Sequence, residues 1–369
     1  MSDNDLYIGL ISGTSVDGVD CVLVSFDASK PELIASHFEE SPASLRDSIL
    51  MLCEGTSINL PSLGDTDVAI GKWFAGAVNN LLAKAKVSAS DVRAIGSHGQ
   101  TIWHQPAGDN PFSMQIGNPN TIAQLTRITT VADFRQRDLS TGGQGAPLAP
   151  LLHREVFQSD SIDRAVINIG GIGNVTMLPA NAASLAFDTG PGNVLMDYWI
   201  GKHQQKRFDE KGEWAATGSS DKDLLHRLLN ETYFALAPPK STGRELFSGP
   251  WLERKLGELG KTINPADVQA TLVDCTVNSI ADAISGLFPP EEIYVCGGGA
   301  HNELLMNKLE SASTQSSVFT TSQLGIDPDW VEAIAFAWMA KQTIEGKKID
   351  TSSFTGASEP VMLGGIYPV

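Results

Sequence analysis

The sequence predicts an α/β fold built from two similar domains, and three observations support this prediction. Apolar, strand-like runs alternate with helical segments through the first half of the chain, a pattern typical of α/β sheets. The opening pattern of strands at residues 6–40 recurs at residues 164–188, about 160 residues later, with little shared sequence. Gly-rich turns follow short apolar strands at residues 12–18, 188–193 and 296–302. We therefore expect a duplicated α/β protein that holds a nucleotide between its two domains.

The individual elements follow from apolar periodicity and from helix-start signals. In the first half we expect strands at 6–12, 19–26, 32–40 and 93–97, and helices near 43–53 and 66–86. In the second half we expect a hairpin at 164–178, strands at 184–188 and 291–296, and helices at 264–286 and 328–344. Asn264 suits the N-cap of its helix, and Pro265 suits the first helical position. The first domain is expected to cover residues 1–130 together with 341–369, and the second to cover residues 131–340.

The composition limits the partners and the compartment. The 369 residues carry a formal net charge of −17, which argues against a general affinity for nucleic acid or anionic membranes. The negative net charge does not exclude a phosphorylated ligand, because backbone N–H groups and a few arginines can bind one locally. The chain shows neither a basic signal-peptide start nor an apolar stretch of membrane-spanning length. Its four cysteines are scattered, and three lie in apolar runs typical of buried, reduced thiols. These observations predict a cytoplasmic enzyme.

The segment from Tyr7 to Phe26 is predicted to form two strands joined by a polar connection. Gly13 and Gly18 let the backbone approach a phosphate closely, because no Cβ intervenes. Exposed N–H groups and small hydroxyls at such a tip suit a polyphosphate. An ordinary hairpin with a polar turn fits this segment equally well. The chain contains neither GxxxxGK[ST] nor a helix-opening GxGxxG, which excludes a P-loop and disfavours a dinucleotide-binding fold.

Several polar side chains lie where they suggest chemistry. Asp188 ends an apolar strand and opens the turn DTGPGN, so it is either a general base or a cap of the turn. Glu332 lies in the otherwise apolar helix WVEAIAFAWMA, where it either faces a ligand or lies on a solvated stripe. His98 and Gln100 are expected in a loop after the strand VRAIGS, a position that faces a ligand in many α/β folds. A purely structural histidine is the alternative there.

Further candidates carry two interpretations each. The segment DFRQRD, with Asp133 and Arg135, is either a solvated loop with local ion pairs or a site where an arginine binds a carboxylate. Asn174 and Asn193 lie in Gly turns, where they either contact a ligand or simply tolerate a positive φ. Trp103 is expected in the core rather than against a ligand.

Sequence blocks in order along the chain indicate a family resemblance. SGTSVDGVD, GSHGQTIWH, QIGNPNTIA, DFRQRD, GGQGAPLAP, NIGGIGN and DTGPGN lie between residues 12 and 193, and CGGGAHN follows at 296–302. Together with the final helix they closely resemble the anhydro-N-acetylmuramic acid kinase family of the actin-like ATPase and sugar-kinase superfamily. The resemblance implies two actin-like (ribonuclease H-like) domains with ATP in the cleft between them. It also implies hydrolytic opening of a 1,6-anhydro amino sugar, coupled to phosphorylation of O6, in the recycling of cell-wall sugars.

The resemblance also implies roles for the matching residues. Asp188 is expected to be the catalytic base, and Glu332 is expected to assist at the sugar and the water. Sugar contacts are expected from His98, Gln100, Asp133, Arg135 and Asn193, with Arg135 meeting the lactyl carboxylate. Contacts to ATP are expected from three turns, at Ser12, Gly13, Thr14, Ser15, Val16, Asp17, Gly18, Val19, Gly170, Gly171, Asn174, Gly297, Gly298 and Gly299.

The expected cofactors are ATP and Mg²⁺. The first hairpin of the superfamily usually carries an aspartate two residues before its Gly-Thr, but Ile11 stands there in this chain. Asp17 is therefore the candidate ligand, and the metal is expected to bind largely through ATP and water. A homodimer is compatible with the family. Two alternatives stay open: a kinase of the same fold acting on an ordinary amino sugar or small acid, and a nucleotide-gated binding protein of actin or chaperone type.

Overall fold

The computed structural model describes residues 5–13, 15–26, 30–55, 59–243 and 246–369. The chain forms two compact units. Unit 1 consists of Met1–Leu152 together with Trp330–Val369, and unit 2 consists of His153–Asp329. We describe each unit by itself.

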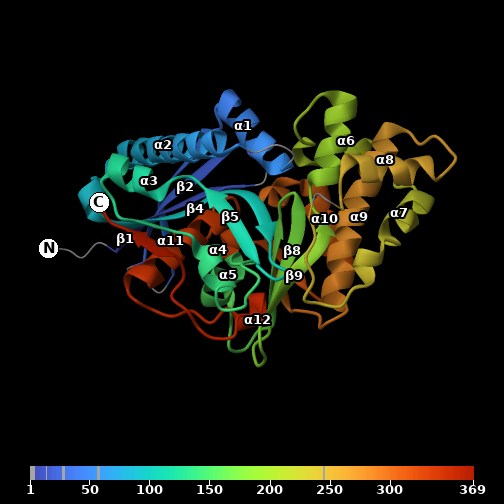
Figure 1. The fold of residues 1–369 in the computed structure, drawn as a ribbon. Coiled ribbons are helices and arrows are strands. Elements are labelled where there is room, and N and C mark those ends of the chain that lie inside the picture. The colour runs from blue at the N-terminus through green and yellow to red at the C-terminus, as the bar shows by residue number, and fades with distance from the viewer. Residues whose placement is uncertain (1–4, 14, 27–29, 56–58, 244–245) are drawn as a thin grey trace. The chain divides into compact units, whose positions relative to one another are not determined.

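Unit 1 is built on a mixed sheet (Figure 1). Its strands are β1 (Leu6–Ser12), β2 (Gly18–Ser25), β3 (Glu32–Glu40), β4 (Val92–Gln105), β5 (Phe112–Ile116), β6 (Thr130–Ala132) and β12 (Gly365–Tyr367). The order is β12-β6-β4-β1-β2-β3, with β5 paired to β4. β1, β2 and β3 are antiparallel neighbours, whereas β4 is parallel to β1 and β6 is parallel to β4.

Helices cover both faces of the unit 1 sheet. The helices of unit 1 are α1 (Ala43–Glu54), α2 (Leu60–Ala85), α3 (Pro119–Thr126), α4 (Phe134–Leu139), α5 (Ala149–Phe157, which runs into unit 2), α11 (Val331–Ile344) and α12 (Ser352–Thr355). Ile8 and Leu10 of β1 pack in one core cluster with apolar residues of α2. Gly9 lies between them and faces α11, because side chains alternate along a strand. α2 and α11 therefore lie on opposite faces of the sheet.

Two glycines let α11 approach the sheet closely. A Cβ built on Gly9 would lie 1.8 Å from the carbonyl oxygen of Ala333. A Cβ built on Gly96 of β4 would lie 2.0 Å from that of Phe336. Because both clashes are with helix backbone, only glycine fits at these positions. This contact sets the position of the first turn of α11, which carries Glu332.

Unit 2 repeats the topology of unit 1. Its strands are β7 (Arg164–Ile169), β8 (Ile172–Leu178), β9 (Leu185–Pro191), β10 (Glu292–Cys296) and β11 (Ser317–Thr320), in the order β11-β10-β7-β8-β9. β7, β8 and β9 are antiparallel neighbours, while β10 is parallel to β7 and β11 is parallel to β10. The order β6-β4-β1-β2-β3 of unit 1 therefore has a counterpart for each strand. This correspondence confirms the duplicated α/β fold that the recurring strands predicted.

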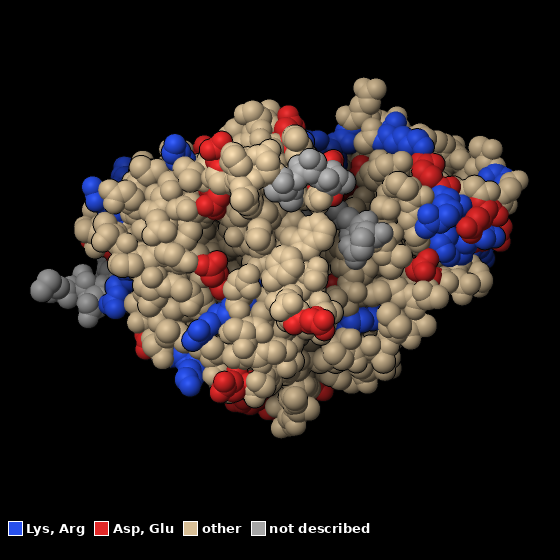
Figure 2. Space-filling model, viewed as in Figure 1, with Lys and Arg blue, Asp and Glu red and all other residues tan. Residues whose placement is uncertain are grey.

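The helices of unit 2 enclose a single apolar cluster of the described residues. They are α6 (Val194–Gln204), α7 (Lys222–Leu229), α8 (Gly249–Gly257), α9 (Pro265–Ser285) and α10 (Glu303–Ala312), with short 3₁₀ turns that include Thr232–Ala235 and Gly298–His301. α9 begins as predicted, with the Asn264 side chain accepting the N–H of Ala266. Figure 2 shows basic and acidic side chains intermingled over α7 and α8, where Lys261 pairs with Asp221 and Asp223. These charges compensate one another locally.

The units divide the chain at other places than expected. The expected boundaries were residues 130 and 340, whereas residues 131–152 and 330–340 group with unit 1. The reason is that β6 pairs with β4, and α11 packs against β1 and β4. Cys21, Cys275 and Cys296 are buried thiols and Cys53 is exposed. In the part of the chain that the structure describes, no helix is both long enough and apolar enough to cross a bilayer.

Candidate active site

The first hairpin of unit 1 is braced from β4. The Ser12 hydroxyl lies 2.7 Å from Gln100 Oε1 and 2.9 Å from the carbonyl of Gly18. Gln100 is fully buried, and its Nε2 donates to the carbonyl of Gly13 at 3.3 Å. β4 runs through to Gln105, so the expected loop at residues 98–100 is wrong: β5 and β1 pair with this stretch and keep it extended. Gln100 thus holds the hairpin in place.

Only some residues of this hairpin present side chains to solvent. Gly13, Ser15 and Asp17 are exposed, and the Ser15 hydroxyl donates to Asp17 Oδ1. Val16 and Val19 are buried in the core, so they offer a ligand only their backbone. Val16 has φ 54°, which is strained for a β-branched residue and typical of a functional turn. Thr14 lies outside the described residues.

Gly18 serves packing. A Cβ at Gly18 would lie 2.8 Å from the carbonyl oxygen of Glu39 in β3 and closer still to the Phe38 ring. A Cβ at Gly13 would meet only the Ser15 hydroxyl, at 3.7 Å. Of the two glycines, Gly13 is therefore the one whose small size is explained by no neighbour in the fold.

His98 and Arg135 form a hydrogen-bonded pair in unit 1. The Arg135 Nε–H donates to His98 Nε2 at 2.9 Å, and Nη1 donates to the carbonyl of Gly145 at 2.8 Å. Burial and the neighbouring guanidinium hold the pKa of His98 well below its ordinary value, so the ring is neutral. Its Nδ1–H then donates to the carbonyl of Gly99. Both ring nitrogens have protein partners, so His98 orients Arg135.

Arg135 remains a cation, although it is largely enclosed by protein. Burial lowers its pKa to about 10, and the carboxylates of Glu332 and Asp138 act in the opposite direction. Asp138 is fully buried and accepts hydrogen bonds from Thr351 Oγ1, Thr355 Oγ1 and the N–H of Gly145. The segment DFRQRD forms the N-cap and most of helix α4, so the alternative of a solvated loop is wrong. Asp138 was not among the expected site residues, because the two threonines that hold its carboxylate lie more than two hundred residues further along the chain.

Glu332 lies in the first turn of α11. Its side chain is accessible to solvent, while the protein around it desolvates the carboxylate enough to raise its pKa. The positive charge of Arg135 lowers that pKa in part. A carboxylate that is reachable from solvent and has a raised pKa is typical of functional acid–base groups. Glu332 and Arg135, which both belong to unit 1, therefore interact electrostatically, and each shifts the pKa of the other.

Asp133, another expected sugar contact, and Trp103, which was expected in the core, lie elsewhere in unit 1. Asp133 has φ 62° and accepts the hydroxyl of Tyr367, which attaches the C-terminal strand β12 beside β6. The pKa of Tyr367 rises to about 12 through burial and this hydrogen bond. Trp103 is 43% exposed and lies beside Gly55, so its expected place in the core is wrong: it sits on β4 beyond the buried stretch.

In unit 2, two Gly turns interlock. The N–H groups of Gly192 and Val194 donate to the carbonyl of Gly171, and that of Asn193 donates to Gly170. The Asn193 amide donates to the carbonyl of Ile169 at 3.0 Å. A Cβ at Gly192 would lie 2.3 Å from the Gly170 oxygen. Asn193 therefore holds the 170–174 turn against the start of α6, and it does not adopt a positive φ.

The glycines of these turns separate into two kinds. A Cβ at Gly297 would lie 2.3 Å from Asn168 Oδ1, and one at Gly299 would lie 2.4 Å from Ile169 Cγ2. At Gly170, Gly171 and Gly298 the nearest atoms lie between 3.8 and 3.9 Å, an ordinary contact distance. Packing explains Gly297 and Gly299. The other three leave room above the backbone, as close approach of a ligand requires.

Asp188 lies inside β9 and not at its end, because β9 continues to Pro191 and stays paired with β8 beyond a shift in register next to Asp188. Its cross-strand neighbour is Asn174, so the two side chains share one face of the sheet. Its Oδ2 accepts the N–H of Thr242 at 3.0 Å. The sequence around DTGPGN gives no indication of this hydrogen bond, because Thr242 lies far from Asp188 in the chain.

The described residues hold no group of three His, Cys, Asp or Glu side chains that would build a metal site. Asp17 is thus a lone exposed carboxylate on its hairpin and not part of a preformed ligand set. The described residues therefore do not by themselves build a complete Mg²⁺ site.

A family model described as anhydro-N-acetylmuramic acid kinase matches residues 5–369. The chain belongs to this family. A relative of that name from Coxiella burnetii (strain Dugway 5J108-111) is 50% identical over 364 residues, 98% of this chain and 97% of the relative. Those from Shewanella pealeana and Saccharophagus degradans are 50% and 47% identical, with coverage of 99% and 98% of both chains, respectively.

Comparison with solved structures concerns the fold alone. Component A of (R)-2-hydroxyglutaryl-CoA dehydratase from Acidaminococcus fermentans aligns with a TM-score of 0.50 at 10% identity, over 92% of this chain and 99% of that one. The family membership confirms the resemblance of the sequence blocks. It also confirms that the chain is a kinase, a phosphotransferase with an alcohol group as acceptor.

Proposed function

We propose that this protein uses ATP and water to convert 1,6-anhydro-N-acetylmuramic acid into N-acetylmuramic acid 6-phosphate and ADP. Membership of the family over residues 5–369 is the observation that carries this proposal. The substrate has no free 6-hydroxyl, so its internal acetal must open as O6 is phosphorylated. Water attacks C1 and the C1–O6 bond breaks. O6 then bonds to the γ-phosphorus, whose bond to the bridging oxygen of ADP breaks.

Asp188 is proposed as the general base that accepts the proton of the attacking water. The N–H of Thr242 fixes one carboxylate oxygen, and Asn174 lies beside it on the same sheet face. This support fixes the orientation of the carboxylate before the substrate arrives. Asp188 thereby serves as a proton acceptor held by β9, rather than as a cap of its turn.

Arg135 and Glu332 are proposed to act on the sugar. A guanidinium oriented by His98 and by the carbonyl of Gly145 suits the lactyl carboxylate of muramic acid. Glu332 is proposed to contact the sugar and the attacking water. His98, Gln100 and Asn193 then contribute by positioning, since their side chains have protein partners.

This proposal predicts a pH dependence. If ionised Glu332 is required, kcat/KM is lost as the pH falls through its raised pKa, at higher pH than for an ordinary glutamate. Arg135→Met removes the charge that lowers this pKa, so the acid limb should move to higher pH. Profiles of kcat/KM for wild type, Arg135→Met and Glu332→Gln test this. If the acid limb of the kcat/KM profile is the same in both variants as in wild type, Glu332 does not have the proposed role.

ATP is proposed to bind through the exposed tip of the first hairpin and the open glycines of unit 2. Mg²⁺ is proposed to arrive on the phosphates of ATP, with Asp17 as the one candidate contact from the hairpin. Bound in this way, the metal would neutralise phosphate charge during transfer. Gly13, Gly170, Gly171 and Gly298 leave space for the phosphates to approach the backbone.

A pair of glycine variants separates binding from packing. Gly171→Ala meets no atom closer than 3.9 Å, so the free energy of unfolding should change by less than about 0.5 kcal/mol. The KM for ATP should nevertheless rise about tenfold, because the methyl group occupies the approach to the backbone. Gly299→Ala is the matched control and should lose about 2 kcal/mol of stability. Urea unfolding with ATP titration checks both, and an unchanged KM in Gly171→Ala would exclude this contact.

The biological setting is part of the proposal. The substrate is a cell-wall amino sugar, so the reaction belongs to peptidoglycan recycling and to the cytoplasm. A homodimer is proposed from the family, and sedimentation would test it. The alternative, a kinase of the same fold acting on an ordinary amino sugar or small acid, has no observation in its favour.

The decisive test uses ATP, Mg²⁺ and 1,6-anhydro-N-acetylmuramic acid in ¹⁸O-water, with mass spectrometry of the products. We expect a sugar 6-phosphate that carries the label at C1, because water attacks that carbon. A product without label would exclude attack of water at C1. Phosphorylation of the open-ring sugar alone would favour the alternative kinase.

A further inference from the structure

The segment Tyr233–Thr242, which we call the strap, covers the free edge of β9. β9 is the edge strand of the unit 2 sheet, so its outward backbone groups need partners from elsewhere. The N–H of Asp188 donates to the carbonyl of Lys240 at 3.0 Å, and the Tyr233 hydroxyl donates to the carbonyl of Asp188 at 2.6 Å. The N–H of Thr242 donates to Oδ2 of Asp188. The strap therefore forms hydrogen bonds with the backbone N–H, the backbone carbonyl and the carboxylate of Asp188.

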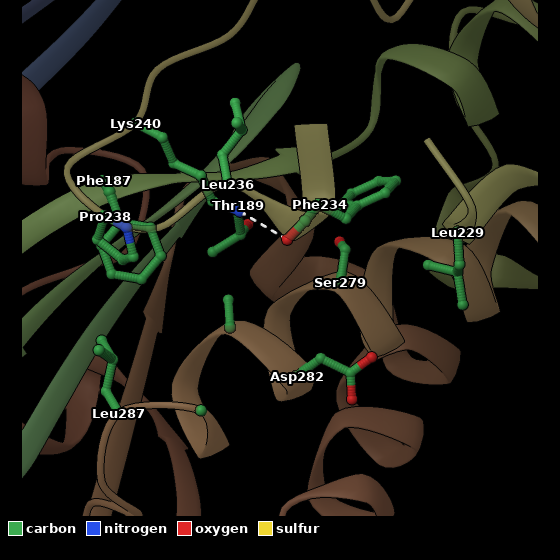
Figure 3. A pocket seen from close by; sticks show the side chains of 12 residues that line it. Phe187, Thr189, Leu229, Phe234, Leu236, Pro238, Lys240, Ser279, Asp282 and Leu287 are labelled. Carbon is green, nitrogen blue, oxygen red and sulfur yellow. Dashed lines mark hydrogen bonds between the residues drawn. The ribbon is translucent and has the colours of Figure 1, made fainter. Parts of the chain in front are cut away.

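Lys240 closes the strap on itself. Its Nζ donates to the carbonyl of Phe234 at 3.1 Å (Figure 3). It also donates to the carbonyl of Tyr233 at 3.2 Å and lies 4.7 Å from the centre of the Tyr233 ring. Burial lowers the pKa of Lys240. The ammonium therefore ties the two ends of the strap together, through the backbone and the ring of the residue that holds Asp188.

A cavity of about 220 Å³ lies behind the strap. Phe187 and Thr189, the neighbours of Asp188 in β9, line one wall, and residues of α9 such as Ser279 and Asp282 line another. Leu236 and Pro238 of the strap face this space in Figure 3. Leu236 is 55% exposed, so the middle of the strap is not packed into the core. Tyr233 and Phe234, at the start of the strap, pack in the core of unit 2. The rest of the strap is held mainly by hydrogen bonds.

We propose that Lys240 is a positioning residue for catalysis, which holds the strap so that Asp188 presents its carboxylate in a single orientation. This inference rests on the proposed role of Asp188 as the general base. Without the ammonium, the strap can move into the cavity behind β9. The donors on Asp188 move with it, while the ATP-binding turns are untouched. A displacement of the base by about 1 Å is enough to lower the rate by up to a hundredfold.

The test compares steady-state kinetics of the full-length wild type and four variants with the anhydro sugar. Lys240→Met keeps the apolar stem but removes the donors, and kcat should fall at least about tenfold while both KM values stay near wild type. Lys240→Arg restores donors and should recover most of the lost rate. Tyr233→Phe removes only the hydroxyl that donates to the Asp188 carbonyl, and it should also lower kcat with the KM values unchanged.

Lys202→Met is the matched control, because Lys202 lies over the Trp199 ring and pairs with Glu253. The kcat of this variant should not change.

The outcomes distinguish this inference from the proposed function. An inactive wild type would overturn the proposed function and the inference together. An active wild type with normal kcat in folded Lys240→Met, or a change confined to KM, would overturn the inference alone. If Lys240→Met does not fold, Tyr233→Phe decides, and a wild-type kcat in that variant overturns the inference. A loss of kcat as large in Lys202→Met would also overturn it, since a general loss of rigidity would then be the cause.

Discussion

Asp188→Asn should lower kcat about a thousandfold, because removal of a positioned general base costs about 10²- to 10⁴-fold. The amide keeps an oxygen that can accept the N–H of Thr242, so the side chain should stay in place. It cannot take the proton of the attacking water. A thousandfold loss corresponds to about 4 kcal/mol of transition-state stabilisation. The KM values for sugar and ATP should change little, because the proton moves only in the transition state.

Steady-state assays with the anhydro sugar measure this effect. Asp223→Asn is a suitable control, since Asp223 is a largely exposed aspartate of unit 2 that pairs with Lys261 at the surface. That variant should keep wild-type kcat. If Asp188→Asn keeps kcat within about tenfold of wild type, another group takes the proton, and Glu332 becomes the first candidate.

Gly96→Ala should destabilise the protein by about 3 kcal/mol, at the upper end of what overpacking costs. The new Cβ would lie 2.0 Å from the carbonyl oxygen of Phe336 and 2.7 Å from its carbon. No side-chain rotation relieves a clash with backbone, so α11 must move away from β4. Because Glu332 is in the first turn of that helix, activity should fall together with stability.

The control for this variant is Gly76→Ala in α2. Nothing lies within 4 Å of a Cβ at Gly76, and alanine is a better helix former than glycine, so stability should rise by about 1 kcal/mol. Urea unfolding of both variants gives the comparison. A Gly96→Ala protein with the stability of wild type would mean that α11 does not approach the sheet as closely as described.

The local sequence pattern was sufficient to predict most of the helices and strands. The periodicity of the first strands and of the 264–286 helix depends on neighbours a few residues apart, and both lie close to where they were expected. The order in which the strands pair was harder to predict from the sequence. The repeated strand order depends on the pairing of two short strands, β6 with β4 and β11 with β10. The boundary of unit 1 depends on α11 returning to β1, a contact across more than three hundred residues.

By itself, the sequence determined the duplicated α/β fold, the family, and the hairpins at residues 7–26 and 164–178, because each of these is encoded in contiguous blocks. Only the tertiary structure decided what individual side chains do. His98 and Gln100 have protein partners and position others, Asp138 fixes the surroundings of Arg135, and the strap holds Asp188. Each of these roles depends on a hydrogen bond between residues distant in the chain. Composition and spacing say nothing about such partners, since the fold alone brings them within 3 Å or so of each other.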